Sequence, residues 1–206
     1  MDLCKNRLPK NMGIPTDQIQ VLSPTRKHIT GTSQLNAMLQ AALNPPSPDK
    51  RERRYGSTVF REGDRVMQVK NNYDILWREE DGSASGMGMF NGDIGVIQSV
   101  DKESVVVNFD GKIVEYTPDM LGELEPAFAV TVHKSQGSEY RAVSWAALEG
   151  APMLMTRGIL YTAITRAKSL FIVVGDESAV AQMVANNRQT RRYSGLRARL
   201  AGEIES

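Results

Sequence analysis

The chain has 206 residues, 41% of them hydrophobic, which suffices for one ordinary core and a smaller module. Its 25 basic and 24 acidic residues leave a net charge of +1, so composition gives no global signal for nucleic acid and any such surface has to be local. The single Cys4 excludes an internal disulfide and a cysteine-based zinc site, and without a secretory signal or a run of about 18 apolar residues we expect a cytoplasmic protein with no membrane partner.

The segment from Met1 to Gln18 predicts a linker, because Pro9, Gly13 and Pro15 interrupt it and it has no hydrophobic period. We expect Cys4 to be an inert thiol near a loose terminus.

Residues 19–23 predict a short strand that ends at Pro24, and Arg26 follows almost directly. A helix is expected next, since residues 30–33 supply a start and Pro45 and Pro46 a stop. Its inner face is predicted to carry Leu35, Met38, Leu39, Ala42 and Leu43.

From Gly56 the pattern changes to short alternating strands separated by glycine turns. This pattern predicts a small closed or nearly closed β-barrel from about Tyr55 to about Leu121. Apolar strands of the parallel type resume only at Phe128, so we expect the barrel to be an insertion in an α/β domain. Four aromatic residues could stack on bases, although core packing is the commoner role in a small barrel: Phe60, Tyr73, Trp77 and Phe90.

Further elements are predicted after the strand that begins at Phe128. Residues 142–148 predict a buried strand, residues 157–168 a helix with Ala167 on its inner side, and residues 170–176 the final central strand of the sheet. Residues 176–187 predict a surface helix. The basic segment 188–200 either grips DNA or packs as a solvated helix, and its two leucines favour the second interpretation.

Two arginines next to predicted strands could contact phosphate. Arg166, at the end of the predicted helix, could neutralise charge developing on a transferring γ-phosphate, and Arg26 could do the same from another side. Arginine suits this role because its fork stays charged and grips two phosphate oxygens. The alternative is that each arginine pairs with a surface carboxylate.

A second group of polar residues follows the strand that begins at Phe128. Hydroxyl, imidazole and ammonium groups gathered there could hold the phosphates of a single nucleic-acid strand. A glycine would allow close backbone approach to a nucleotide, and a glutamate could accept hydrogen bonds from ribose. The residues are Thr131, His133, Lys134, Ser135, Gln136, Gly137 and Glu139. A lone histidine after a strand is more often structural, and only His28 accompanies His133, so no metal site is expected.

The sequence has no G-x-x-x-x-G-K-[ST] loop and no acidic pair placed to hold Mg²⁺. This chain alone therefore cannot complete an ATPase site, and we expect it to be inactive by itself.

Three segments resemble motifs of superfamily I helicases, most closely the RecD-like DNA helicases. VLSPTRK at 21–27 resembles motif IV, TVHKSQGSEY at 131–140 motif V, and YTAITRAK at 161–168 motif VI. Residues 63–74, 89–97 and 107–116 are similar to the Src-homology-3-like barrel inserted in these helicases. The resemblance implies an α/β fold: a RecA-like parallel sheet without its own P-loop, carrying an inserted all-β barrel. It also implies a discontinuous second motor domain, residues 1–54 and 122–206, interrupted by the barrel at 55–121.

The resemblance implies roles for the residues that match each motif. Arg166, as the arginine finger, and Arg26 would contact the γ-phosphate. Gly137, Glu139 and Gln136 would face the nucleotide, Glu139 towards the ribose, and Gln136 would couple the two sites. Thr131, His133, Lys134 and Ser135 would touch the DNA backbone.

The same resemblance implies the partners of the chain. ATP and Mg²⁺ would be held mainly by an N-terminal RecA-like domain of the same protein. Single-stranded and duplex DNA, and other recombination subunits of an exodeoxyribonuclease V type of enzyme, would be further partners, with unwinding from 5′ to 3′. The alternative is an interaction module for nucleic acid or protein that kept a RecA-like scaffold without catalysis.

Overall fold

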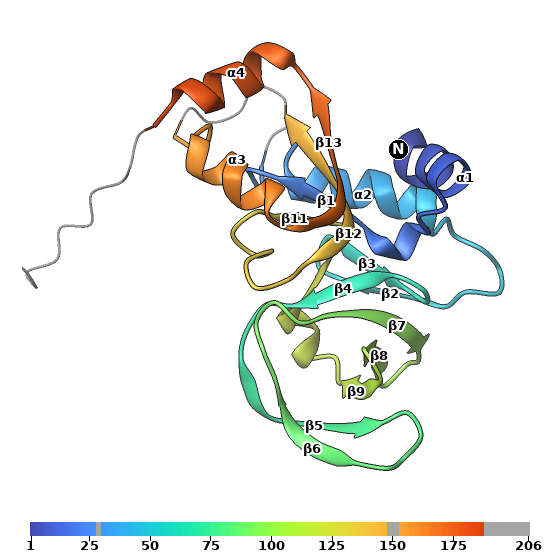
Figure 1. The fold of residues 1–206 in the computed structure, drawn as a ribbon. Coiled ribbons are helices and arrows are strands. Elements are labelled where there is room, and N and C mark those ends of the chain that lie inside the picture. Colours follow the sequence, from blue (N-terminus) through green and yellow to red (C-terminus); the bar gives the residue numbers. More distant parts are fainter. Residues whose placement is uncertain (28–29, 148–152, 188–206) are drawn as a thin grey trace, which may run out of the picture.

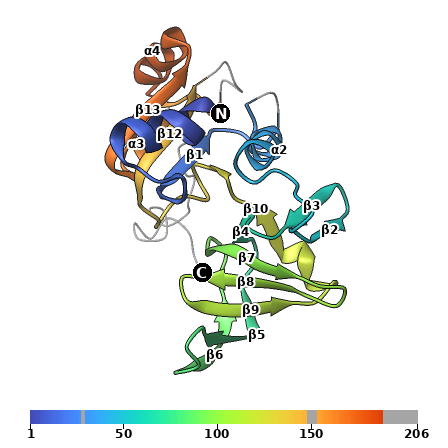
Figure 2. The ribbon, with the colours of Figure 1, turned by 90° about the vertical axis from the view of Figure 1, so that its right-hand side faces the viewer.

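The computed structural model describes residues 1–27, 30–147 and 153–187. A parallel sheet with its helices lies on one side of the molecule, and an all-β part lies on the other (Figures 1 and 2). The chain enters the all-β part after α2 and returns to the parallel sheet at β11, as expected for an insertion. Among the described residues, no helix is long and apolar enough to cross a membrane.

The parallel sheet has the strand order β11-β1-β12-β13. These strands are Ala129–Thr131, Ile19–Ser23, Tyr140–Ala147 and Ala167–Gly175. All five residues of β1 are buried, because β11 and β12 flank it and separate apolar clusters cover its two faces, one with Leu22 and the other with Ile19 and Val21. The prediction that the last strand is central was wrong. Strand β13 forms the edge of the sheet, and Val173 and Val174 are 40% and 48% exposed.

Among the helices that accompany this sheet in the described residues are α2 at Thr32–Leu43, α3 at Arg157–Ile164 and α4 at Glu177–Ala185. The helix predicted before Pro45 is confirmed, but Met38 is exposed and Asn36 takes a place on the buried face. Helix α3 is shorter than predicted, since Ala167 already pairs with Tyr140 as the first residue of β13. The basic segment 188–200 lies outside the described residues.

The N-terminal segment is structured, so the prediction of a linker with a loose Cys4 was wrong. It contains a π-helical turn at Leu3–Arg7, α1 at Leu8–Met12 and a 3₁₀ turn at Thr16–Gln18. Cys4, Leu8 and Ile14 are buried and pack with α2 and β1.

The all-β part contains a seven-stranded sheet in which every neighbouring pair is antiparallel, with the order β10-β4-β7-β8-β9-β5-β6. Its strands are β4 at Arg65–Gln68, β5 at Asn72–Glu79, β6 at Ser85–Met89, β7 at Ile94–Val100, β8 at Val105–Phe109, β9 at Lys112–Tyr116 and β10 at Leu124–Pro126. A 3₁₀ turn, Met120–Glu123, precedes β10, and the hairpin of β2, Glu52–Tyr55, and β3, Thr58–Arg61, stands beside this sheet.

The four aromatic residues of the barrel divide between core and surface. Phe60 is 1% exposed and belongs to the barrel core, and Trp77 packs against it from the side. Tyr73 and Phe90 are exposed and meet edge to face, with ring centroids 5.8 Å apart. Core packing was therefore the wrong expectation for Tyr73 and Phe90.

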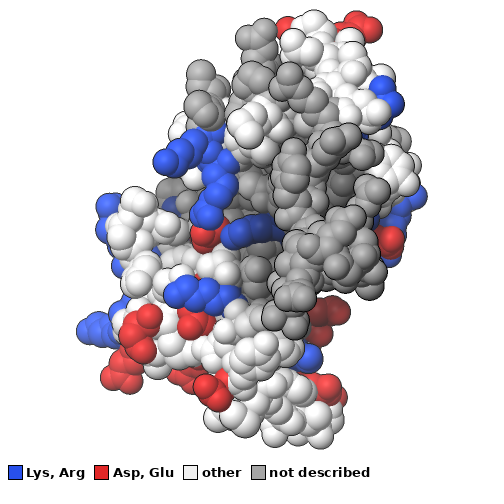
Figure 3. All heavy atoms as spheres, turned by 90° about the vertical axis from the view of Figure 1, so that its left-hand side faces the viewer, with Lys and Arg blue, Asp and Glu red and all other residues white. Residues whose placement is uncertain are grey.

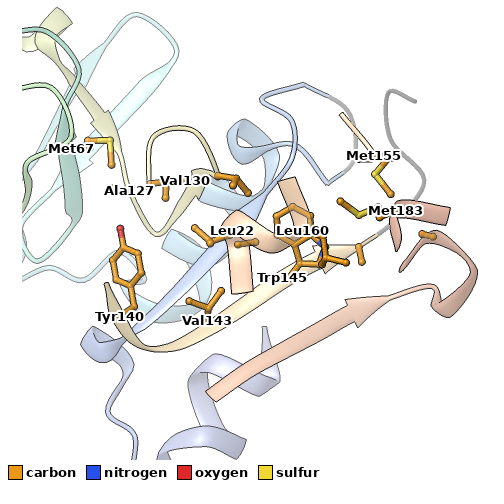
Figure 4. Packing of buried hydrophobic residues seen from close by; sticks show 14 residues of the cluster. Leu22, Met67, Ala127, Val130, Tyr140, Val143, Trp145, Met155, Leu160 and Met183 are labelled. Carbon is orange, nitrogen blue, oxygen red and sulfur yellow. The ribbon is translucent and has the colours of Figure 1, made fainter. Parts of the chain in front are cut away.

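Strand β4 joins the two parts because its side chains alternate between two cores. Val66 belongs to the barrel core, whereas its neighbour Met67 belongs to the core under the parallel sheet. Figure 4 shows Met67 beside Ala127, with the ring of Tyr140 pointing towards them from β12. The two parts are thus packed on each other through apolar side chains rather than linked only by the chain.

Candidate nucleotide and DNA site

Arg26 stands on a tight turn that follows the carboxyl end of β1. Ser23 Oγ donates to the Thr30 carbonyl at 2.6 Å, and Thr25 Oγ1 donates to the Lys27 carbonyl at 2.7 Å. Gly31 closes the turn, and a Cβ there would lie 2.3 Å from the Lys27 carbonyl oxygen, so only glycine fits. Arg26 projects from this turn into a cleft of about 450 Å³ between α2 and the β2–β3 turn.

Arg26 and Lys134 share one carboxylate. Arg26 Nη2 lies 2.5 Å from Glu125 Oε1, and Lys134 Nζ lies 2.9 Å from Glu125 Oε2. Glu125 belongs to β10, the edge strand of the barrel sheet. Its partial burial opposes ionisation, but Lys134 and Arg26 outweigh that burial and hold the pKa of Glu125 below its ordinary value. We call Arg26, Glu125 and Lys134 the ion triad.

The loop of residues 131–139 carries most of the remaining predicted site residues. Thr131 Oγ1 accepts from the Lys134 N–H at 3.4 Å, which helps to fix the first turn of the loop. His133, Gln136, Gly137 and Glu139 are exposed, and Gly137 has a φ of +89°, which favours glycine.

Ser135 does not fit the DNA contact predicted for it. It is fully buried, and its hydroxyl donates to the Val132 carbonyl at 2.8 Å. The hydroxyl therefore stabilises the turn of the loop, and the prediction that Ser135 contacts the DNA backbone was wrong.

Arg166 ties the two helicase-like motifs V and VI together. Its backbone carbonyl accepts from the Tyr140 N–H at 2.8 Å, and its Nη1 donates to the Ser138 carbonyl at 3.0 Å. Its Nε also lies 3.4 Å from the Thr162 carbonyl at the end of α3. Lys168 Nζ lies 3.6 Å from Glu139 Oε2, so one positive charge lies next to the carboxylate predicted to face the ribose.

The predicted residues thus form two groups rather than one. Arg26 follows the carboxyl end of β1, whereas Arg166 precedes the amino end of β13, and both strands run parallel to β12. The two arginines therefore start from opposite ends of the parallel strands. The 131–139 loop runs from one end to the other, because Thr131 pairs with Ser23 at the carboxyl end of β1 and Tyr140 pairs with Ala167 at the amino end of β13.

Acidic residues accompany the basic ones across this region. Figure 3 shows Lys and Arg side chains beside Asp and Glu on one face, without an unbroken basic surface among the coloured residues. In the all-β part, away from these residues, Arg51 likewise forms ion pairs with Glu62 and Asp101. Among the described residues, no group of three His, Cys, Asp or Glu side chains could hold a metal ion. Arg26, 59% exposed, and Arg166, partly exposed, keep donors within reach of solvent and so fit phosphate oxygens.

Sequence reasoning missed Glu125, Ser138 and Lys168. A single glutamate between a turn and a proline resembles any solvated residue, so no local signal marked Glu125. Ser138 acts through its backbone carbonyl, which the side-chain pattern does not reveal.

Two family models match this chain. The ATP-dependent RecD-like DNA helicase SH3 domain matches residues 35–109, and the UvrD-like helicase C-terminal domain matches residues 126–174. Over these two segments the chain is similar to RecD-like and UvrD-like helicases. This confirms the family inferred from the motifs, and it confirms the SH3-like nature of the inserted barrel.

Curated RecD-like relatives align with much of the chain. The ATP-dependent RecD2 DNA helicase of Deinococcus radiodurans is 35% identical over 86% of this chain and 23% of its own length. The RecBCD enzyme subunit RecD of Mycobacterium tuberculosis is 38% identical over 56% of this chain and 20% of its own length. The chain therefore spans about a fifth of the length of these relatives.

A solved structure of two coordinating Pif1 helicases at forked double-stranded DNA has the same fold. It aligns with a TM-score of 0.52 and 16% identity over 98% of this chain and 47% of that chain. The predicted fold class, a RecA-like parallel sheet with an inserted small barrel, is confirmed.

Proposed function

We propose that this chain is a motor half of an ATP-dependent DNA helicase, with residues 1–54 and 122–206 as a second motor domain and residues 55–121 as the barrel inserted in it. Strand β10 of the second segment adds an edge strand to the barrel sheet. ATP and Mg²⁺ would be held mainly by a first RecA-like domain of the same protein. Arg166 and Arg26, which start from opposite ends of the parallel strands, would reach the phosphates from two sides across the cleft between the domains. The chain by itself would not hydrolyse ATP.

The contact between Arg166 and the 131–139 loop supports this proposal most directly. Arg166 holds the Ser138 carbonyl and the Tyr140 N–H on either side of Glu139, so a phosphate bound by Arg166 would be felt at the loop. Within the described residues Arg166 makes no ion pair, and its charge is left for an anion from outside the chain.

The DNA contacts belong to the same proposal. His133 and Lys134 would contact phosphates of a single strand, and Thr131 would support them through the loop. The cytoplasm, where recombination subunits like those of the RecD relatives could join it, would be the place of action.

The test is Arg166→Ala in a protein that contains both motor domains. We expect DNA-stimulated ATP turnover to fall about a thousandfold, the loss typical of a missing arginine finger, while binding of a single-stranded oligonucleotide persists. Arg7→Ala, at an exposed arginine of the N-terminal turn, is the matched control and should leave turnover unchanged. Near-normal turnover in Arg166→Ala would refute the role and favour the non-catalytic interaction module.

A further inference from the structure

The ion triad brings a proposed nucleotide contact and a proposed DNA contact onto one carboxylate. Arg26 binds one oxygen of Glu125 and Lys134 binds the other, at 2.5 and 2.9 Å. The two cations belong to separate segments, since Arg26 follows β1 and Lys134 lies in the 131–139 loop. Glu125 comes from a third segment, strand β10 of the barrel sheet. Two positive charges and one negative charge leave the triad with a net charge of +1.

We propose that Glu125 is a shared counter-ion that makes phosphate binding at Arg26 and phosphate binding at Lys134 oppose each other. The inference rests on the function proposed above, which assigns a nucleotide phosphate to Arg26 and a DNA phosphate to Lys134. It adds a residue that neither motif contains and an explanation of how the two ligands are coupled.

Charge balance gives the direction of this coupling. When a nucleotide phosphate binds Arg26, Glu125 keeps Lys134 as its only partner. Arg26 is then paired with the phosphate and Lys134 with Glu125. Lys134 loses attraction for DNA as a result. When DNA takes Lys134, Glu125 holds Arg26 more firmly, because coupling between two ligands is reciprocal. Without Glu125, each cation would keep a full charge for its own phosphate.

The surroundings make the effect appreciable but moderate. The side chains of Lys134, Glu125 and Arg26 are 24%, 37% and 59% exposed, so solvent screens the pairs in part. We therefore expect a coupling at the lower end of the usual range, about fivefold to tenfold in affinity. A coupling of this sign is useful to a motor, because it loosens one grip on DNA when nucleotide arrives.

The competing explanation is that the same ion pairs only stabilise the packing of β10 against the 131–139 loop. Purely structural ion pairs would affect the stability of the fold but would not change how nucleotide alters the affinity for DNA. The distinguishing quantity is the ratio of the Kd for an oligothymidylate with saturating non-hydrolysable ATP analogue and Mg²⁺ to the Kd without it. It is measured by fluorescence anisotropy on the full-length protein with both motor domains.

Glu125→Gln should lower this ratio by about fivefold or more relative to the wild type. A second readout is the dependence of log Kd on log salt. The analogue should reduce that slope by about 0.7 in the wild type, the value for one single-strand phosphate contact, and leave it unchanged in Glu125→Gln. Glu115→Gln, the same charge change at an exposed residue of β9, should behave as the wild type. In a Lys134→Gln background, Glu125→Gln should have no further effect on the ratio.

Each outcome decides the inference. An unchanged ratio in a folded Glu125→Gln variant, checked by circular dichroism, overturns the shared counter-ion while leaving the proposed function intact. Should Glu125→Gln not fold, Lys134→Gln alone has to show the same loss of coupling, and an unchanged ratio there overturns the inference as well. A wild-type protein that binds neither probe refutes the proposed function itself.

Discussion

The two arginines of the candidate site are held in different ways. Arg26 pairs with the carboxylate of Glu125, which it shares with Lys134, whereas the guanidinium of Arg166 contacts the Ser138 and Thr162 carbonyls and the Thr165 hydroxyl. Carbonyl partners orient a guanidinium but do not cancel its charge. Arg166 is therefore the arginine better prepared for an anion in this conformation, and Arg26 has to exchange its partner first.

The residue types of the site could be read from the sequence, but their pairing could not. Arg26, Lys134 and Arg166 stand out because polar residues at strand ends have no place in a core. Glu125 has no such signal, since its partner Arg26 lies 99 residues away and only the folded chain brings them together. Burial of Ser135 was equally hidden, because a serine that closes a turn looks the same as one that faces DNA.

Asp64 offers a test of electrostatics at a single residue. It is 1% exposed, and its oxygens accept from Gln40, Asn44 and the Arg61 N–H. Burial raises the pKa of Asp64 above its ordinary value despite these hydrogen bonds, which act in the opposite direction. Because the pKa of Asp64 is higher in the folded than in the unfolded state, protonation of this carboxyl stabilises the fold. This contribution is complete below the unfolded-state pKa and is lost as pH rises through the folded-state pKa.

Asp64→Asn should lower the free energy of unfolding by about 1–3 kcal/mol, because it leaves a buried donor without its acceptor. The difference from the wild type should shrink as pH rises above the ordinary aspartate pKa of about 4 and through the raised pKa of Asp64. Urea unfolding at several pH values measures both effects, with Asp74→Asn, at an exposed position of β5, as the control. A difference that grows with pH would contradict the raised pKa.

At the scale of elements, residues taken for breakers lie within or at the end of helical structure. Pro9 lies in the first turn of α1, where the π-helical turn leads into the helix with helical backbone at Arg7 and Leu8, and Gly13 ends the helix with a φ of +59°. Their close spacing suggested a linker, yet Cys4, Leu8 and Ile14 between and around them supply a buried face. Helices this short have too few periodic residues for the pattern to be recognised.

The opposite error affected β13. A run of apolar β-branched residues predicts a strand covered on both faces, but Val173 and Val174 are largely exposed at the sheet edge. Strand type was predictable from local sequence, whereas position within the sheet depends on which segments pair, and that is set by tertiary contacts.

Gly137 tests the backbone of the 131–139 loop. A Cβ at Gly137 would meet nothing within 4 Å, so the cost of Gly137→Ala should come from its φ of +89° alone. We expect a loss of about 1–2 kcal/mol in the free energy of unfolding. Gly158→Ala, inside α3, is the matched control and should stabilise by about 0.5–1 kcal/mol, since helical alanine is preferred. Thermal unfolding of both variants gives the comparison, and equal shifts would argue against strain at Gly137.

At the scale of the whole molecule, the shared strand β4 predicts that barrel and parallel sheet unfold together. Met67 is 1% exposed and packs with residues of the sheet, although its strand belongs to the barrel. Met67→Ala should cost about 2–5 kcal/mol, whereas Met87→Ala, at a 58% exposed position, should cost less than about 0.5 kcal/mol.

The two tryptophans report on the two parts, because Trp77 lies in the barrel and Trp145 in the parallel sheet. In urea titrations of Trp77→Phe and Trp145→Phe proteins, each with and without Met67→Ala, the remaining fluorescence signal should move by the same amount in both. If Met67→Ala moved only one of the two transitions, the parts would be independent folding units.

The general architecture could be predicted because strand periods, turn glycines and the order of motifs all agree. An α/β part interrupted by an all-β insertion follows from the sequence, and the structure and relatives confirm it. The division of the predicted site residues between the two ends of the parallel strands could not be predicted. It depends on the relative directions of the strands, which no single segment of the sequence specifies.

The order of strands in the parallel sheet also bears on biosynthesis. Strand β1 finds both of its neighbours, β11 and β12, about a hundred residues further along the chain. A ribosome would release this strand, whose five residues are all buried in the folded protein, well before either neighbour exists, while the barrel strands emerge next to their own partners. The barrel should therefore fold first during translation. Until β11 and β12 are synthesised, β1 has no partners, and a chaperone would be needed at this strand.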